Sequence, residues 1–178
     1  MKIYKIGIIG CGGIAQKMAA TLEKMKGVER YAVASRNQEK AEAFANKWGF
    51  TKAYGSYEEL ASDPEVDLIY IATPHAMHYD NAHMCIEKGK PVLCEKAFTA
   101  NARQAEDLLA FAKEKGVFIT EAIWTRYMPL SLKIQELLKE GVIGTPYTLS
   151  ANLSYPISNK ERIIRPELAG GALLDIGV

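Results

Sequence analysis

The sequence predicts an α/β protein with a doubly wound parallel sheet, followed by the beginning of a second, α+β domain. Short β-rich runs alternate with amphipathic helical stretches through most of the chain. A glycine-rich string, GCGGIA, stands between the first such run and the first helical stretch. Near Trp124 the alternation stops. We therefore divide the chain into residues 1–123 and residues 124–178, the latter an incomplete second domain.

Composition excludes several classes of protein. The 178 residues are 48% hydrophobic and 24% charged, which is typical of a globular chain. The formal net charge of +1 gives no reason to expect a nucleic-acid or membrane partner, and no apolar run approaches the roughly 20 residues of a membrane span. Three cysteines are too few for a disulfide framework, and their odd number would leave one without a partner. We therefore expect a reducing, cytoplasmic setting.

The first expected strand is Lys5–Ile9, and the helix after it places Ile14, Met18, Leu22 and Met25 on one face. The opening MKIYKIGIIGCGG has the basic start and apolar middle of a short signal peptide. We reject that interpretation because the glycines follow a strand and open a helix, so cleavage would remove a core element.

The second expected strand is Tyr31–Ala34. In the helix that follows, Ala41, Phe44 and Trp48 line up, and Gly49 ends it. The first strand, the helix after it and the second strand together form one strand–helix–strand unit.

The middle of the chain holds the strongest strand signal. Ser56–Glu59 has the spacing of a capping box and predicts a short helix. Leu68–Ala72 is a continuous apolar run, as expected in a parallel sheet buried on both faces. A helix from about Tyr79 to Lys88 follows, closed by Gly89.

Two more strands, Val92–Cys94 and Val117–Thr120, enclose a helix over Asn101–Lys115 that Gly116 stops. The residues of this helix expected to face inward are Ala105, Leu108, Leu109 and Ala112.

The remaining chain predicts a helix over Leu130–Lys139 and a strand over Pro146–Tyr155. An isolated strand exposes unpaired amides, and the closing GGALLDIGV begins an apolar helix that does not continue. We expect a fragment of a longer protein, rather than a tail completed by a second copy or a disordered tail. Residues up to about Thr120 are expected to fold well.

The string Gly10-Cys-Gly12-Gly13-Ile14-Ala15 matches G-x-G-x-x-A between a strand and a helix, which is the context of a dinucleotide-binding Rossmann unit. Gly10 permits the turn, Gly12 lets the backbone approach a pyrophosphate, and Ala15 lets helix and strand pack. Amides at the helix start, at Gly13 and Ile14, would face the phosphates. The alternative is a plain strand-to-helix turn.

The end of the second strand carries no acid. A carboxylate there would accept hydrogen bonds from the ribose and repel a 2′-phosphate, whereas Ser35 and Arg36 suit a phosphate. Lys40, one helical turn later, adds a second positive charge. The sequence therefore favours NADP over NAD, although Arg36 could instead be a solvated residue at a helix start.

Three further segments follow strand ends, where ligands bind in open α/β sheets. In the first, ATPHAMH, His75 and His78 have no third metal-type residue at a convincing spacing, so we expect no metal site. His78 is as well explained by backbone hydrogen bonds as by a cofactor contact. In the second, Glu95 and Lys96 are either a structural ion pair or a pair in which Lys96 serves proton transfer.

The third segment, EAIWTRYMP, places Trp124 and Tyr127 on either side of Arg126. Such a mixture can line a pocket for a ring or polyol, so Trp124 and Arg126 are candidate substrate contacts. Aromatic residues at a domain junction are also ordinary packing residues.

Taken in order, GCGGIA, IATPHAMH, LCEKA, EAIWTRYMP and GGALLDIG resemble the Gfo/Idh/MocA family of oxidoreductases, most closely its dimeric dihydrodiol dehydrogenase branch. The resemblance covers the whole chain. It implies a Rossmann domain followed by a domain with a large, mostly antiparallel sheet that forms the pocket floor and the contact between subunits. It further implies hydride transfer between a nicotinamide and a carbohydrate, polyol or diol, in a homo-oligomer.

The resemblance also implies roles for individual residues. Lys96 would hold the reacting hydroxyl, Glu95 would lie near the nicotinamide ribose, and Asp175 would point into the active site. Thr73, Pro74 and His78 would border the cofactor, and Trp124 would line the pocket, as the set of matched positions suggests.

Two departures from the family pattern stand out. Ala97 replaces the proline that usually follows the lysine, so the backbone after Lys96 is less restricted. The histidine or tyrosine expected about four residues after Asp175 lies beyond Val178. Because fold does not fix function, a nucleotide-sensing regulatory protein, or a fragment without catalytic activity, is the competing hypothesis. Retention of Lys96 and Asp175 together favours the enzyme.

Overall fold

A computed structural model describes residues 2–157 and 159–177 of the chain. Six parallel strands form one sheet in the order β3-β2-β1-β4-β5-β6. They are β1 (Tyr4–Ile9), β2 (Val28–Ala34), β3 (Lys52–Tyr54), β4 (Leu68–Ile71), β5 (Val92–Cys94) and β6 (Ile119–Glu121). The order reverses between β1 and β4, which is the switch point where open α/β sheets bind ligands.

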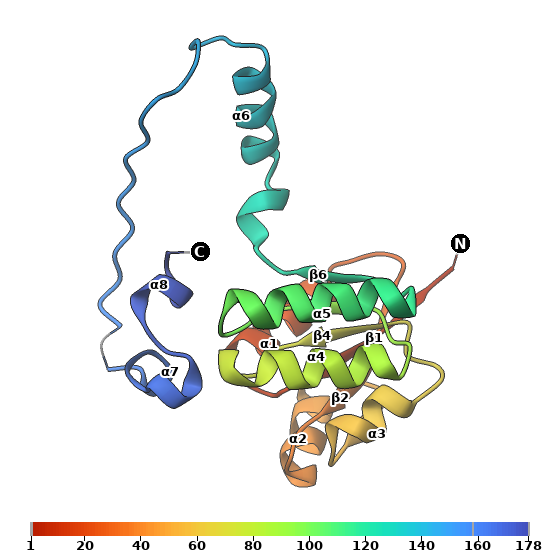
Figure 1. Cartoon of the computed structure of the whole chain (residues 1–178). Coiled ribbons are helices and arrows are strands. Elements are labelled where there is room, and N and C mark those ends of the chain that lie inside the picture. Colours follow the sequence, from red (N-terminus) through yellow and green to blue (C-terminus); the bar gives the residue numbers. More distant parts are fainter. Residues whose placement is uncertain (1, 158, 178) are drawn as a thin grey trace.

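Helices connect the strands and continue beyond the sheet (Figure 1). The α-helices are α1 (Gly13–Leu22), α2 (Gln38–Trp48), α3 (Tyr57–Ser62), α4 (His78–Glu87), α5 (Ala102–Lys115), α6 (Pro129–Lys139), α7 (Glu161–Ile164) and α8 (Ala172–Asp175). Three short 3₁₀ helices are η1 (His75–Met77), η2 (Trp124–Tyr127) and η3 (Pro166–Leu168). This arrangement confirms the predicted doubly wound Rossmann fold.

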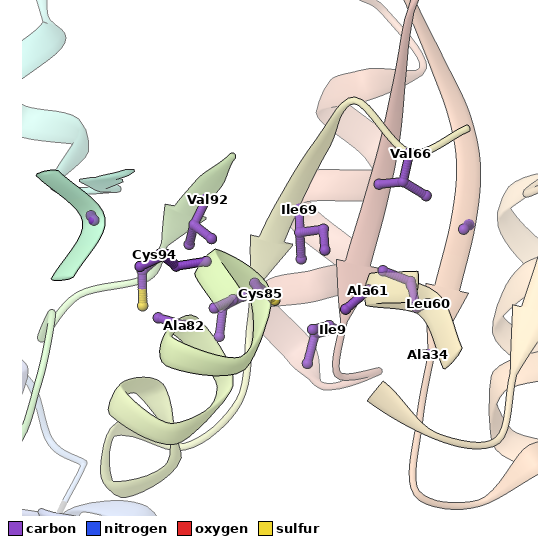
Figure 2. Packing of buried hydrophobic residues seen from close by; sticks show 14 of the residues in the cluster. Ile9, Ala34, Leu60, Ala61, Val66, Ile69, Ala82, Cys85, Val92 and Cys94 are labelled. Carbon is purple, nitrogen blue, oxygen red and sulfur yellow. The ribbon is translucent and has the colours of Figure 1, made fainter. Parts of the chain in front are cut away.

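The core lies in two layers, one on each face of the sheet. Side chains alternate along β4, so that Ile69 and Ile71 face one layer and Tyr70 faces the other. The first layer packs the sheet against α3, α4 and α5, and the second packs it against α1 and α2. Figure 2 shows Ala82 and Cys85 of α4 packed against the strands of the first layer.

Several helix ends follow the predicted signals. Ser56 Oγ accepts a hydrogen bond of 3.2 Å from the amide of Glu59, so the predicted cap of α3 is confirmed. Gly49 and Gly116 end α2 and α5 in the left-handed conformation, with φ of 67° and 65°.

The predicted inner faces of two helices were partly wrong. In α1 the buried residues are Ala15, Ala19 and Leu22, while Ile14 is 40% exposed. Met25 lies after α1 ends and is also exposed. Close packing of α1 on the sheet selects small side chains, and this turns the larger Ile14 toward the cleft described below.

In α5, Leu108 and Ala112 are buried as predicted, but Leu109 is 50% exposed. Strand β3 has no apolar run of its own and was not anticipated, because its three residues gain their place only by pairing with β2.

The predicted strand over Pro146–Tyr155 was wrong. All of its residues are described, and none of them pairs with another strand. Figure 1 shows α6 standing away from the sheet and this segment returning from it as an extended trace toward α7 and α8. Without a neighbouring strand, the alternating pattern has no ladder to join.

Candidate active site

The glycine-rich loop connects β1 to α1 at the switch point. Gly10 has φ of +98°, and a Cβ there would lie 2.9 Å from the carbonyl oxygen of Ala72, so the close approach of β1 and β4 requires glycine. Gly12 and Gly13 border open space instead. Ala15 is fully buried against the sheet, in keeping with the predicted packing.

The start of α1 is suited to an anion. Its N-cap residue, Gly12, makes no side-chain cap, and the first turn holds no acidic residue. The first amides of α1 have no partner within their helix and lie beside the open space at Gly12 and Gly13, so they could bind the pyrophosphate of a dinucleotide. The loop fits the cofactor that its sequence implies.

The end of β2 lies beside this loop, since the amide of Gly10 donates to the carbonyl of Ala34 at 2.9 Å. The next residue, Ser35, is buried, whereas Arg36 and Lys40 are exposed. Asn37 caps α2 by accepting a 2.8 Å hydrogen bond from the amide of Lys40. Arg36 thus lies between β2 and α2, and Lys40 lies in the first turn of α2, near the carboxyl end of β2, where the ribose of a dinucleotide lies in this fold.

Two residues beside these cations escaped the sequence analysis. Burial raises the pKa of the Cys11 thiol, and the charge of Lys40 partly offsets this effect. Burial likewise raises the pKa of the Tyr57 hydroxyl, and the charge of Arg36 opposes it. Cys11 and Tyr57 therefore lie near Lys40 and Arg36, the expected contacts of a 2′-phosphate, and the local sequence around Tyr57 gives no sign of this.

A cleft of about 640 Å³ opens in front of the glycine loop. It brings together residues from the loop, from the ends of β4 and β5, and from the last described segment of the chain. Its lining includes half of the predicted site residues: Gly12, Gly13, Ile14, Thr73, Pro74, Glu95, Lys96 and Asp175. Lys17, His75, Lys160 and Arg162 also line it and were not predicted as contacts.

Lys96 and Asp175 meet in this cleft although 79 residues separate them. Lys96 Nζ lies 3.3 Å from Asp175 Oδ1 and donates a hydrogen bond to the carbonyl of Asp175. The guanidinium of Arg162 contacts the same carboxylate, with Nη1 on Oδ1 and Nη2 3.5 Å from Oδ2. One buried carboxylate is therefore held by two cations.

These cations determine the charge of Asp175. Burial alone raises the pKa of its carboxyl, but the hydrogen bond from Arg162 and the charges of Lys96 and Arg162 outweigh burial. The net effect lowers the pKa of Asp175 below its ordinary value, so this carboxylate stays ionised at neutral pH.

Glu95 lies at the floor of the cleft. It accepts a hydrogen bond from the hydroxyl of Tyr70, and its Oε2 lies 3.2 Å from the amide of Lys96. Burial, together with the hydrogen bond to Glu95, raises the pKa of Tyr70, so the tyrosine remains a neutral donor. Glu95 thus supports the backbone of Lys96 and does not form an ion pair with its ammonium within the described residues.

His78 is fully buried and does not line the cleft. Its Nδ1 lies 2.7 Å from the carbonyl of Ala97 and its Nε2 lies 2.8 Å from the carbonyl of Thr73. Burial lowers the pKa of His78, an effect that the two carbonyls oppose. Both ring nitrogens therefore lie against backbone carbonyls, as in the backbone alternative that the sequence left open. His78 thus joins the chain after β4 to the Lys96–Ala97 peptide bond, which is cis.

The aromatic residue predicted to contact substrate lies in a second cleft of about 720 Å³. Trp124 and Tyr127 line this second cleft. Ile14 and Glu95 line both clefts. Arg126 is exposed and lines neither cleft, because η2 turns it outward.

Metal-binding groups and membrane-spanning helices were both sought among the described residues. No group of three histidine, cysteine or acidic side chains there could hold a metal ion. No helix among them is both long and apolar enough to cross a membrane.

Comparison with known proteins decides the family. Residues 4–122 match the model of the GFO_IDH_MocA oxidoreductase family, described as having an NAD-binding Rossmann fold. The chain belongs to the Gfo/Idh/MocA family. The predicted family and fold are both confirmed.

Two relatives illustrate the range of the Gfo/Idh/MocA family near this chain. One is the D-xylose 1-dehydrogenase (NADP(+)) of Hypocrea jecorina, 44% identical, with 98% of this chain and 50% of that protein aligned. Another is the trans-1,2-dihydrobenzene-1,2-diol dehydrogenase of Xenopus tropicalis, 41% identical over 97% of this chain and 53% of that protein. The chain spans about half the length of the curated relatives it matches.

Solved structures give the same assignment. A variant of KijD10, a 3-ketoreductase from Actinomadura kijaniata in complex with TDP-benzene and NADP, superposes with a TM-score of 0.82 at 31% identity. The match covers 99% of this chain and 55% of that one. An NAD binding oxidoreductase from Klebsiella pneumoniae gives a TM-score of 0.75 at 34% identity, over 80% of this chain and 40% of that one.

Proposed function

We propose that this protein is an NADP-dependent oxidoreductase that acts on a CH–OH group of a sugar, polyol or cyclic diol. The meeting of Lys96 with Asp175 in the cleft before the glycine loop supports this proposal most strongly. A protein that only sensed a nucleotide would need neither side chain there. The NADP-dependent xylose dehydrogenase and the diol dehydrogenases among its relatives support the substrate class.

Lys96 would bind the oxygen of the reacting CH–OH group. An ammonium has three N–H donors, and within the described residues two of them are directed at Asp175. The third can bind a substrate oxygen in the cleft. When bound, the nicotinamide supplies the hydride acceptor or donor.

Oxidation of the CH–OH group would transfer one hydride to the bound nicotinamide and one proton from the substrate oxygen to Lys96, which accepts it in its amine form and becomes the ammonium. Asp175 fixes the ammonium in place and keeps positive charge next to the oxygen while negative charge develops on it. In the reverse direction Lys96 donates its proton to that oxygen.

Cofactor choice would depend on Ser35, Arg36 and Lys40. The guanidinium of Arg36 can bind a 2′-phosphate through two hydrogen bonds, and Lys40 adds a point charge one turn away. The exposure of both side chains beside the glycine loop supports this role.

Turnover in the presence of NADP, measured as NADPH formation over a panel of aldoses, polyols and cyclic vicinal diols, tests the proposal. Lys96→Met is expected to lower the rate by about a hundredfold or more while NADPH still binds, because the variant loses the proton donor and acceptor. Lys113→Met, on the exposed side of α5, serves as the matched control and should leave the rate unchanged. NADPH binding without turnover on any of these alcohols would favour the sensing protein or the fragment without catalytic activity instead.

A further inference from the structure

Arg162 lines the cleft but has no part in the chemistry described above. It lies on α7, thirteen residues before Asp175, and its guanidinium spans both oxygens of the Asp175 carboxylate. Its side chain is 49% exposed, whereas that of Asp175 is 8% exposed. A half-exposed cation thus reaches inward to a buried anion.

We infer that Arg162 is a positioning residue that holds the Asp175 carboxylate ionised and correctly oriented beside Lys96. The inference rests on the proposed function, because it assigns Arg162 to the Lys96–Asp175 pair of that site. Arg162 itself touches neither reacting atom in this scheme.

Arg162 can position Asp175 because its guanidinium and the Lys96 ammonium both contact Asp175 Oδ1. Lys96 Nζ approaches Oδ1 from the Rossmann side and Arg162 Nη1 approaches it from α7. Without Arg162, the buried carboxylate would have a single cation beside it, and Oδ2 would lose its contact. A buried carboxylate with one partner protonates more readily, and a protonated Asp175 would hold the ammonium less firmly.

Other charged groups around Asp175 do not replace Arg162. His75 lies nearby on η1 with its Nδ1 3.3 Å from the carbonyl of Ala169, and burial lowers the pKa of this imidazole, which favours its neutral form. Lys160 and Glu95 line the same cleft, but neither makes a hydrogen bond or ion pair with Asp175 within the described residues. Lys96 and Arg162 are therefore the cations in contact with the carboxylate in that part of the chain.

The test is a pH titration of the carboxyl carbon of Asp175, followed by NMR in the 178-residue chain. Asp175→Asn assigns the signal. Arg162→Met is expected to raise the pKa of the Asp175 carboxyl by about one unit, because a neighbouring guanidinium typically lowers an aspartate pKa by at least that much. Arg162→Lys, which keeps the positive charge, should restore most of the shift.

The matched control is Arg165→Met. Arg165 lies on the same segment with similar exposure, but it pairs with Glu161 and Glu167 outside the cleft. This variant should leave the titration of Asp175 unchanged.

Amide hydrogen exchange at Asp175 and Ile176 separates positioning from simple support of the segment. Their amides donate to Gly171 and Ala172 and should stay equally protected in Arg162→Met. An unchanged pKa in that variant would overturn the inference, and so would a changed pKa accompanied by loss of this protection. NADPH binding, measured on the same samples, reports on the proposed function separately, because its failure would leave the titration result intact.

Discussion

Residues 4–122 and residues 124–177 contrast sharply, although both carry regular apolar patterns. In the first region the patterned side chains are buried in two layers around the sheet. In the second, Tyr147 and Leu149 are 93% and 92% exposed. An apolar pattern therefore produces structure only where another element covers it. The cleft in front of the glycine loop joins the two regions at Lys96 and Asp175.

Limited proteolysis in dilute solution should give the largest contrast. Chymotrypsin is expected to cut after Tyr147, Leu149 or Leu153 more than about a hundredfold faster than at any site in residues 4–122, because segments without secondary structure open at little cost in free energy. Mass spectrometry of the first fragments provides the measurement.

First cuts inside β1 to β6 would contradict the expected difference in protease resistance between the two regions. Uniform resistance of residues 142–157 would do the same, since it would mean that a partner covers them in solution. Dilution to low micromolar concentration separates the second case from self-association.

A buried leucine and an exposed leucine test the same difference through the free energy of unfolding. Leu60 on α3 is fully buried, so Leu60→Ala should lower the free energy of unfolding by about 2–5 kcal/mol through lost burial and a cavity. Leu149→Ala should change it by less than about 0.5 kcal/mol. Urea denaturation monitored by circular dichroism measures both, and equal effects would contradict the division into covered and uncovered regions.

A matched pair of ionic contacts gives a smaller effect. Asp63 is buried and accepts hydrogen bonds from Lys52 at 2.8 Å and Tyr54 at 2.6 Å. Asp63→Asn should cost about 1–3 kcal/mol at pH 7, because donors lose a charged acceptor. Glu136→Gln, which removes the exposed contact with Lys133 on α6, should cost less than about 0.5 kcal/mol.

The effect of Asp63→Asn should also depend on pH. Burial raises the pKa of the Asp63 carboxyl, but the hydrogen bonds from Lys52, Tyr54 and the amide of Glu65 outweigh it and hold the pKa well below its usual range. Because the pKa is lower in the folded state, the stabilisation is complete above the unfolded value of about 3.9 and is lost as pH falls through the folded one. The gap between wild type and variant should therefore be constant near neutrality and narrow below about pH 4. A gap that widens in acid would contradict this account.

The fold was readily predicted where the signals were local. Leu68–Ala72, the glycine-rich string and the left-handed glycines each specify an element through neighbouring residues. The inner faces of α1 and α5 were less predictable, since contact with the sheet rather than periodicity selects Ala15 over Ile14. Strand β3 forms because it pairs with β2, and the segment over Pro146–Tyr155 forms no strand because it has no neighbouring strand. Neither outcome can be predicted from the local sequence.

The site divides in the same way. The glycine loop and the cations after β2 could be predicted as cofactor contacts from the sequence, because position relative to a strand end is a local property. Arg162, Tyr70 and Lys17 were missed, because only folding brings them to the cleft or beneath it. The adjacency of Glu95 and Lys96 suggested an ion pair, yet the structure directs the ammonium to Asp175.

We propose that residues 4–122 bind a phosphorylated dinucleotide through the glycine loop and the cations after β2. Titration of the chain with NADPH and with NADH, followed by nicotinamide fluorescence, tests it most directly, alongside Arg36→Asp and the control Arg103→Asp on α5. We expect wild type and control to prefer NADPH by about tenfold or more, and Arg36→Asp to lose that preference, because a charge-assisted phosphate contact contributes about 1.5–3 kcal/mol. A wild-type chain that prefers NADH, or an Arg36→Asp variant that still prefers NADPH as strongly, would contradict the account.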